Sequence, residues 1–403
     1  MRIGIVDQSA SGWVAASIYS RMILRSLQSA AAESQVELFF LTGSESDQQP
    51  PNSTLLRMTA ADYLPGEKQF RNLFGLAEKS QAFRGEVRLR RIFGLASKSD
   101  LFAVAREHKL DVLLPLLDLP PWQVTAKTIG WIPDFQHVHL PQFFNRHDLE
   151  RRDLTYKRLA QHASVVMLSS EAARRDFVNF APEEAAKGRV ISFPSLLAFE
   201  DLATDPTVTR TKFHLPEKFA LVANQFWAHK NHRLVVEALE TLQRQKLRVP
   251  VVMTGLPADH RDPANKTFSA LLQSIASANL SGQIMILGLV PYDDLVNLMR
   301  TAALIIQPSR FEGWSTIVQD AVALGRPIVC SDIAVHREQV PNALGFFPTD
   351  RPDVLAELLE SKWKQLSPGP DKIIEEKSLA SERAFSGRHG VSLLNLCAEV
   401  ATL

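Results

Sequence analysis

Two acidic residues on either side of a short glycine-containing segment are the most chemically suggestive feature of the sequence. Glu312 and Asp320 lie eight positions apart, with a glycine and two small hydroxyl residues between them. The apolar run at 302–306 is typical of a buried strand, and the pattern from Ser315 to Gly325 predicts a helix. One carboxylate is therefore expected in a loop before a helix, and the other on the helix itself.

This arrangement suits the binding of a nucleoside diphosphate that carries a sugar. The first turn of a helix exposes N–H groups and a partial positive charge, and both attract phosphate. Carboxylates on either side would accept hydrogen bonds from the hydroxyls of the sugar and the ribose. The alternative is an ordinary solvated helix start, and the strand–loop–helix context favours the binding site.

A second polar segment, Asn-Gln-Phe-Trp-Ala-His-Lys-Asn-His at 224–232, follows the apolar run 219–223. In a doubly wound sheet, ligands bind beyond the carboxyl ends of the strands. Lys230 is therefore placed to reach a diphosphate, although a solvated loop lysine would look the same. For His229 and His232, helix capping or surface exposure is as plausible as catalysis.

The segment from Glu312 to Asp320, with its continuation at 323–329, resembles the acid-x7-acid signature of retaining GT-B glycosyltransferases of family 4. The resemblance implies that Glu312 contacts the transferred sugar. It implies that Asp320, where the family usually has Glu, binds the ribose. Donor binding then extends to the residues between the acids, namely Gly313, Trp314, Ser315 and Thr316.

The loop at 224–232 resembles the same family less completely. Family members usually have a Gly-Arg pair and then a Lys, and both cations hold the departing diphosphate. Lys230 matches the Lys, whereas Asn224 and Gln225 stand where the Gly and the Arg would be. The resemblance then requires another source for the second positive charge, with His229 and Arg310 as the two candidates.

Glycines after two further expected strands belong to the same sheet edge. Gly255 follows the strand at 249–254 and Gly288 follows the strand at 283–287, where glycine permits either a tight turn or the close approach of a ligand. By resemblance, the nucleotide base would lie near Gly288 and Leu289.

Two loops of the N-terminal half are the expected acceptor side of the cleft. Ser11 and Gly12 lie between the first strand and the first helix, where acceptor domains of this family approach the donor. Asp134 matches the acid of a His-Asp pair in family members, and Pro133 occupies the usual His position. His137 is the candidate to take the role of that His beside the donor sugar. The other interpretation is that these polar residues only order the loop.

Strand and helix patterns alternate in both halves, so we expect an α/β fold of two Rossmann-like, doubly wound domains that face a central cleft, as in GT-B proteins. The expected N-terminal elements are strands at 3–7, 36–41, 112–115, 128–132 and 165–168 and helices at 15–32 and 149–162. The expected C-terminal strands lie at 219–223, 249–254, 283–287 and 304–307, with one more beginning at 328–329 and another beyond Val329. The expected C-terminal helices, besides the one from Ser315 to Gly325, lie at 233–245, 267–278, 293–301 and 352–366. The expected division is an acceptor-binding domain at 1–195, a linker at 196–218, a donor-binding domain at 219–377 and a helical tail at 378–403 that packs back on the first domain.

Composition narrows the class of protein. The chain has 403 residues with 45 basic and 44 acidic side chains, so its net charge does not indicate a nucleic-acid partner. Two cysteines form no disulfide framework and no zinc spacing. We expect no signal peptide and no transmembrane helix, and therefore a cytoplasmic protein. No Asp-x-Asp motif occurs, which fits metal-independent chemistry without a cofactor.

A basic and partly apolar stretch, Lys68 to Lys98, holds eight Lys and Arg residues against two Glu. It would suit anionic lipid headgroups or a lipid-linked acceptor at the inner face of the membrane, or form a solvated cover. The sequence thus predicts a retaining glycosyltransferase that moves sugar from a UDP- or GDP-sugar to a glycan, lipid-linked or small-molecule acceptor, in cell-envelope polysaccharide or glycoconjugate synthesis. A GT-B epimerase, a phosphorylase and a non-catalytic sugar- or partner-binding module are the alternatives.

Overall fold

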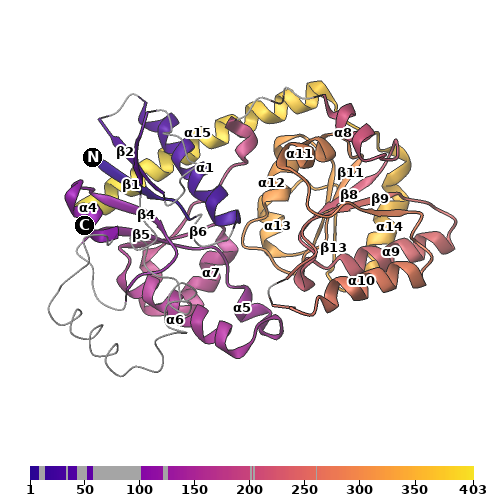
Figure 1. Ribbon diagram of the computed structural model, residues 1–403, viewed down its shortest axis with the longest axis horizontal. Coiled ribbons are helices and arrows are strands. Elements are labelled where there is room, and N and C mark those ends of the chain that lie inside the picture. Colours follow the sequence, from indigo (N-terminus) through magenta and orange to yellow (C-terminus); the bar gives the residue numbers. More distant parts are fainter. Residues whose placement is uncertain are drawn as a thin grey trace.

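The structure is a computed structural model that describes residues 1–8, 14–32, 35–42, 52–57, 101–120, 126–199, 202, 205–259 and 261–403. Ser11, Gly12 and the basic stretch Lys68–Lys98 lie outside the described residues. The described chain forms two α/β domains, which stand side by side in Figure 1.

The first domain is built on a parallel sheet whose order is β3-β2-β1-β4-β5-β6-β7. Its strands are β1 (Arg2–Val6), β2 (Glu37–Thr42), β3 (Thr54–Arg57), β4 (Val112–Leu116), β5 (Lys127–Ile132), β6 (Val165–Leu168) and β7 (Gly188–Val190). The helices are α1 (Val14–Ala31), α4 (Leu101–Glu107), α5 (Gln136–His139), α6 (Arg146–His162) and α7 (Glu171–Phe180). Strands β4 and β6 are buried along their whole length, as expected where helices cover both faces of a parallel sheet.

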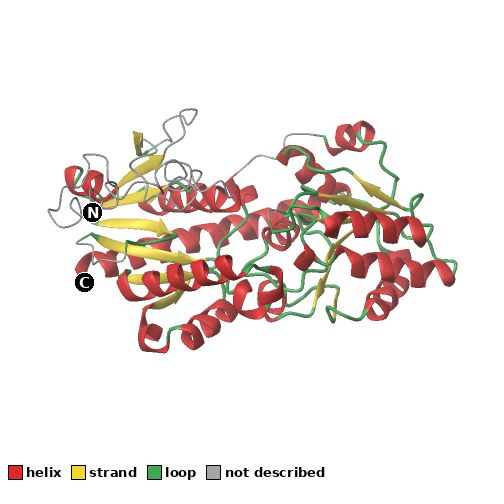
Figure 2. Cartoon of the chain, turned by 60° about the horizontal axis from the view of Figure 1, so that its bottom comes forward, coloured by secondary structure: helices red, strands yellow, loops and turns green. Residues whose placement is uncertain are grey.

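The second domain repeats this design with the strand order β10-β9-β8-β11-β12-β13. Its strands are β8 (Ala220–Ala223), β9 (Val251–Thr254), β10 (Ile284–Ile286), β11 (Leu304–Gln307), β12 (Ile328–Ser331) and β13 (Gly345–Phe347). Its helices are α9 (His232–Arg244), α10 (Lys266–Ser277), α11 (Tyr292–Thr301), α12 (Thr316–Ala323), α13 (Ala334–Gln339) and α14 (Pro352–Lys362), and α8 (Pro206–Lys212) precedes it. Figure 2 shows helices around the strands of each sheet.

The order of each sheet reverses beside its first strand. In the first domain β1 pairs with both β2 and β4, and in the second β8 pairs with both β9 and β11. The loops that leave β8 and β11 therefore diverge at a topological switch point, where open α/β sheets bind ligands. These are the loops that carry Lys230 and Glu312.

Helix α15 (Lys372–Thr402) joins the two domains. Its first turn is tied to the second domain by a buried ion pair between Arg300 and Glu375, with Nε to Oε1 at 2.7 Å. Farther along, His389 Nδ1 lies 2.9 Å from Ser26 Oγ of α1. A Cβ at Gly390 would collide with the carbonyl oxygen of Ser26, so glycine permits the close packing of α15 on α1. The helix runs along both domains (Figure 1).

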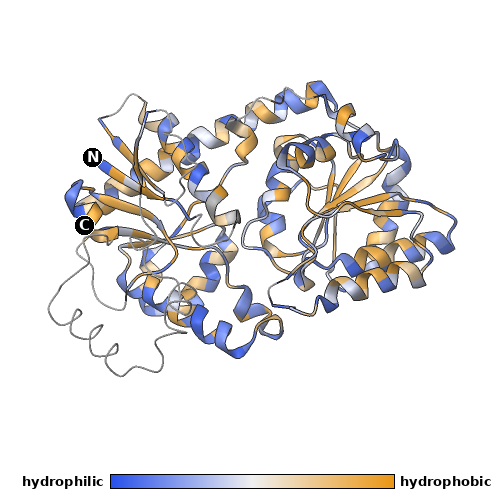
Figure 3. Cartoon of the chain, viewed as in Figure 1, coloured by the Kyte–Doolittle hydropathy of each residue, from blue (hydrophilic) through white to orange (hydrophobic). Residues whose placement is uncertain are grey.

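Apolar residues fill the cores between each sheet and the helices that cover it, and polar residues lie on the outer faces of the helices (Figure 3). The expected strands agree closely with those in the structure, and two short strands, β3 and β7, were not expected. The last helix begins at Lys372, six residues before the expected position. Asp371 caps it by accepting a hydrogen bond from Ile374 N, a cap that the weak period of this region conceals.

Candidate functional site

The loops after β8 and β11 are fastened to each other at the switch point. The backbone N–H of Arg310 donates to the carbonyl oxygen of His229 at 2.7 Å. Asn231 Nδ2 donates to the carbonyl oxygens of Pro308 and Thr349 at 3.2 and 2.9 Å. Asn231 has φ +58°, in the left-handed region that asparagine tolerates better than most residues. The two loops therefore form one rigid platform.

Lys230 and Glu312 meet on this platform. Lys230 Nζ lies 2.6 Å from Glu312 Oε1, and the two side chains are only 15% and 10% exposed. Most of the water around this ion pair is thus excluded, which strengthens its electrostatic interaction with a neighbouring ligand. The structure brings together the two residues that the sequence singled out most strongly.

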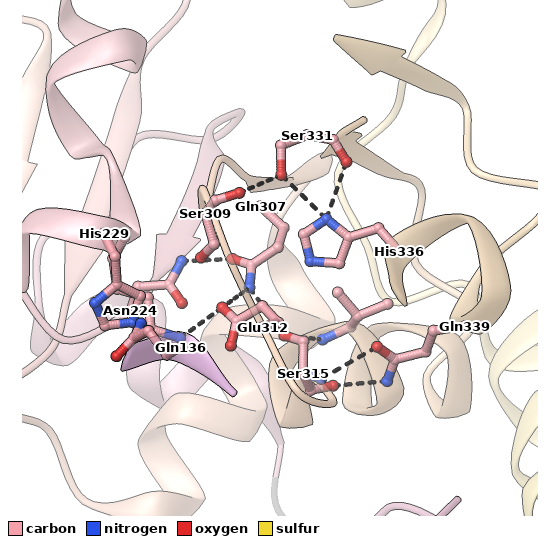
Figure 4. A network of polar contacts seen from close by, with 12 residues as sticks. Gln136, Asn224, His229, Gln307, Ser309, Glu312, Ser315, Ser331, His336 and Gln339 are labelled. Carbon is pink, nitrogen blue, oxygen red and sulfur yellow. Dashed lines mark hydrogen bonds and ion pairs between the residues drawn. The ribbon is translucent and has the colours of Figure 1, made fainter. Parts of the chain in front are cut away.

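A buried glutamine holds the carboxylate of Glu312 from the other side. Gln307 Nε2 donates to Glu312 Oε1 at 3.1 Å and to Ser315 Oγ at 2.8 Å. Gln307 Oε1 accepts from Asn224 Nδ2 at 2.5 Å. Figure 4 shows Gln307 between Asn224 on one side and Glu312 on the other. Asn224 was expected to bind the donor, whereas its side chain here supports Gln307.

The first turn of α12 is tightly organised. Ser315 is its N-cap and accepts a hydrogen bond from Val318 N. The N–H of Ser315 donates to Gln339 Oε1 at 3.2 Å, and Gln339 Nε2 returns a bond to the Ser315 carbonyl at 2.7 Å. Both the hydroxyl and the amide of Ser315 are thus used inside the protein. The N–H groups of the next residues, with Thr316 exposed, stay the candidates for phosphate.

Asp320 has quite different surroundings from Glu312. It is 7% exposed, and its Oδ1 accepts from Ser195 Oγ at 2.5 Å. Ser195 N in turn donates to Glu382 Oε1 of α15 at 2.6 Å, and Gln319 Nε2 donates to both oxygens of Glu382. Burial is the main cause that raises the pKa of the Glu382 carboxyl. In this conformation Asp320 is bonded to Ser195, and its ribose contact stays a prediction.

Asp134 reaches the platform from the first domain. A Cβ at Gly313 would collide with the carbonyl oxygen of Pro133 and lie 2.9 Å from Asp134 Cβ, so the two loops touch directly. Asp134 Oδ1 accepts from Gln136 N at 2.9 Å and lies 3.5 Å from Arg152 Nη1. The backbone contact places Asp134 beside the loop that carries Glu312.

His137 does not reach the cleft. Its side chain is 2% exposed, and Nε2 lies 3.1 Å from Asp153 Oδ1. The ring packs at right angles against Tyr156, with ring centroids 5.2 Å apart. Burial lowers the pKa of His137, aided by Arg152 and opposed by the nearby carboxylates. The expected position beside the donor sugar is therefore not observed, because α5 directs His137 against Tyr156 and Asp153 of α6.

An arginine that the sequence did not single out bridges the domains next to Lys230. Arg261 forms a two-point ion pair with Asp259, and its Nη1 donates to Gln136 Oε1 of the first domain at 3.0 Å. Its Nη2 lies 3.4 Å from His229 Nδ1. Burial lowers the pKa of His229 strongly, and the charges of Lys230 and Arg261 add to this effect. His229 is therefore neutral and cannot supply the second positive charge.

The remaining donor-side residues extend along the sheet edge. Gln225 Oε1 accepts from Leu256 N at 2.6 Å, which ties the loops after β8 and β9 together. Gly255 has φ +151°, and a Cβ there would collide with the carbonyl oxygen of Asn224. Gly288 has φ +69° with open space beside it, and Leu289 is 66% exposed. The space beside Gly288 and Leu289 is open, and the contact with a nucleotide base stays a prediction.

Arg310 lies on the opposite side of the platform. It is exposed and lines an open pocket of about 450 Å³, together with Leu140 of the first domain and Asp332, Pro348, Thr349 and Asp350 of the second. The pocket spans the two domains beyond Glu312. Trp314, the other residue of this segment, donates from Nε1 to the carbonyl oxygen of Phe193 at 3.1 Å and so contacts the end of the first domain.

His336 completes the buried polar cluster. Its Nδ1 lies 3.0 Å from the carbonyl oxygen of Ser331, so this nitrogen carries the proton. Burial lowers the pKa of His336, and the negative charge of Glu312 opposes that shift. A neutral histidine therefore stands close to the carboxylate (Figure 4).

Sequence reasoning missed Gln307, Arg261, Gln339, Ser195 and Glu382. Only Gln307 carried a signal, because it is the polar last residue of a buried strand at the carboxyl edge of the sheet. Among the described residues no helix is long and apolar enough to cross a membrane. Within the same residues no group of three or more His, Cys, Asp or Glu side chains is arranged to hold a metal ion.

Part of the sequence is similar to known glycosyltransferases. Residues 208–376 match the family described as Glycosyl transferases group 1. A stretch of 174 residues is 27% identical to O-antigen chain mannosyltransferase B of Escherichia coli. That stretch covers 42% of this chain and 42% of the mannosyltransferase, so the chain matches less than half of that relative.

Solved structures match over nearly the whole chain. Sucrose-phosphate synthase of Thermosynechococcus elongatus superposes with a TM-score of 0.66 at 16% identity and covers 99% of both chains. A glycosyltransferase of Rickettsia africae gives a TM-score of 0.64 at 13% identity, over 99% of this chain and 97% of that one. HepE of Anabaena, in complex with UDP and glucose, gives 0.61 at 15% identity, over 100% and 99% of the two chains. At such identities the likeness shows the fold alone, and that fold is confirmed as GT-B.

Proposed function

From a GT-B chain whose residues 208–376 belong to the group 1 glycosyltransferases, we propose a retaining, metal-independent sugar transfer from a nucleoside-diphosphate sugar to a hydroxyl of a glycan or lipid-linked acceptor. The observation that carries the proposal is the secluded pair of Lys230 Nζ and Glu312 Oε1, 2.6 Å apart at the switch point. A cation for the departing diphosphate and an acceptor for sugar hydroxyls are thereby held together.

In the proposed reaction the bond from the anomeric carbon to the phosphate oxygen breaks. The acceptor oxygen bonds to the same carbon on the same face, and its proton passes to the departing phosphate. Negative charge grows on the diphosphate as it leaves. Lys230 and the free N–H groups in the first turn of α12 stabilise that charge, and this electrostatic term is often the largest in catalysis.

Glu312 orients the sugar and favours positive charge at the anomeric carbon. The observed contact between Gly313 and Pro133 supports a closed cleft, in which Asp134 faces the sugar from the first domain. Water excluded from such a cleft cannot compete with the acceptor. Asp320 would bind the ribose only after release from Ser195.

Donor and acceptor are proposals from the relatives. The similarity to a mannosyltransferase of O-antigen chains favours a nucleoside-diphosphate mannose and a growing polysaccharide as substrates. The neighbour solved with UDP and glucose makes UDP-glucose the second donor to test. A cytoplasmic protein at the inner membrane face would meet both donor and lipid-linked acceptor.

The test is a panel of UDP- and GDP-sugars with the purified full-length chain. Release of nucleoside diphosphate and transfer to lipid-linked or free saccharides are measured with and without EDTA. We expect one donor to be used, with rates unchanged by EDTA and the anomeric configuration kept in the product. Binding without turnover of any donor would favour the non-catalytic module, and neither binding nor turnover would reject the proposal.

A further inference from the structure

The buried side chain of Gln307 differs from an ordinary core glutamine in where its hydrogen bonds go. Gln307 is 0% exposed at the end of β11. Each of its three side-chain hydrogen bonds ends on a residue of the candidate site: Asn224, Glu312 and Ser315. A glutamine that only satisfied the core would bond mainly to nearby backbone or water.

The neighbours of Gln307 fix which end of its amide faces Glu312. Glu312 is an ionised acceptor, so the group that contacts it must be the NH₂. Asn224 then presents its own NH₂ to Gln307 Oε1 at 2.5 Å, and Ser315 Oγ accepts the second proton of Gln307 Nε2 at 2.8 Å. A flipped amide would set its oxygen against the carboxylate. The orientation is therefore determined by the network.

The consequence for Glu312 is an asymmetric carboxylate. Oε1 receives Lys230 Nζ at 2.6 Å from the loop after β8 and Gln307 Nε2 at 3.1 Å from the end of β11. The described residues offer Oε2 no hydrogen-bond donor within the same range. One oxygen is thus held by the protein while the other is left for a sugar hydroxyl.

We infer that Gln307 is a positioning residue, which fixes the rotamer of Glu312 so that Oε2 faces the sugar of the donor. This inference rests on the proposed function and deepens it. Lys230 cannot do this alone, because it must also meet the diphosphate and is free to swing toward it. Gln307 stays with Glu312 throughout the reaction, since it lies on a strand with no access to the cleft.

Ser315 ties the same device to the phosphate cradle. Its hydroxyl accepts from Gln307 and also caps α12 by accepting from Val318 N. Ser315 is also held by Val318 N and by Gln339, so loss of the bond from Gln307 should leave the helix N-terminus in place and displace the carboxylate of Glu312. A shift of about 1 Å in such a group can cost about 100-fold in rate.

The test compares Gln307→Met with wild type in donor turnover. Methionine keeps the length of the side chain and removes both the donor and the acceptor. We expect kcat to fall by about 100-fold, while binding of the free nucleoside diphosphate, which has no sugar, stays within about twofold by calorimetry. Gln283→Met is the matched control, because Gln283 donates from Nε2 to Val249 O at 2.9 Å at the opposite end of the sheet.

Gln307→Glu supplies the second readout. Its carboxyl still accepts from Asn224, but places a second acid beside Glu312, so the acid limb of the pH–rate profile should move to higher pH. If the side chain at position 307 did not lie against Glu312, that limb would stay in place. Should Gln307→Met not fold, the pH profile of Gln307→Glu decides the question by itself.

Two results would overturn the inference. The first is a kcat of Gln307→Met within about twofold of wild type. The second is a loss of diphosphate binding equal to the loss of kcat, which indicates a general defect of the site. Both results require a wild-type protein that turns over a donor, whereas a wild-type protein without any turnover rejects the proposed function itself.

Discussion

The two acids at the ends of the segment from Glu312 to Asp320 have different surroundings. Glu312 contacts a cation, lies next to the first domain through Gly313 and has one oxygen to spare. Asp320 lies on α12 and accepts a hydrogen bond from Ser195, and Ser195 and Glu382 continue the hydrogen-bond chain into α15. The first end lies against the loop that carries Asp134, and the second lies against Ser195, which is bonded to α15.

One short helix, α12, connects these two surroundings. Helix α12 is only eight residues long, so its N-terminus and Asp320 move as one body. A displacement of the helix N-terminus would therefore also displace Asp320. Substitutions at Glu312 should therefore affect activity most, and substitutions at Asp320 should affect stability most.

The largest effect is expected for Glu312→Gln at the cleft end. The change keeps shape but removes the charge, so kcat should fall by about 10²–10³-fold. Unfolding by urea should change little, with exposed Glu360→Gln as the control. A Glu312→Gln protein with full kcat would break the comparison at its cleft end.

The next largest effect is expected for Lys230→Met. Loss of a charged hydrogen bond to the diphosphate should weaken nucleoside-diphosphate binding by about 1.5–3 kcal/mol in calorimetry. The double variant with Glu312→Gln should show a non-additive loss of kcat/KM, because the two side chains are in contact. Strict additivity would mean that the ion pair has no part in turnover.

At the other end of the segment, Asp320→Ala and Ser195→Ala each remove one partner of the buried hydrogen bond between these two side chains. Each should lower the free energy of unfolding by about 1–3 kcal/mol, while nucleoside-diphosphate affinity changes less than about threefold. Loss of affinity in Asp320→Ala alone would show that Asp320 does reach the ribose. That outcome would assign both acids to the cleft.

The smallest expected effect is a pH dependence of the free energy of unfolding, which arises from Glu382. The folded pKa of Glu382 is raised by burial above its ordinary value of 4.5, so the folded state binds this proton more tightly. Its contribution to stability is then present below pH 4.5 and is lost as pH rises through the raised pKa. Glu382→Gln should flatten this slope, by no more than about 1.4 kcal/mol per pH unit.

Urea midpoints between pH 4 and 7 provide the measurement for this prediction. Exposed Glu376→Gln on the same helix is the control and should keep the wild-type slope. An unchanged slope in Glu382→Gln would mean that the buried carboxyl of Glu382 does not titrate in this window.

The local sequence predicted the fold and the proximity of Lys230 to Glu312. Apolar runs marked the buried strands, and the rule that ligands bind at the carboxyl edge brought Lys230 toward Glu312. The surroundings of Asp320 and His137 were not predictable, because burial depends on partners distant in sequence: Ser195 is 125 positions from Asp320. Arg261 was missed for the same reason, since only the folded chain places it against Gln136.

The backbones of Gly313 and Pro133 touch where the two domains meet. Where a side chain would collide, the absence of one defines how near the domains can come. Alanine at position 313 would act as a spacer of a single methyl group, and the closed cleft would admit water. Such a protein should release sugar to solvent in preference to an acceptor, so the ratio of hydrolysis to transfer would report the fit of the closed domains.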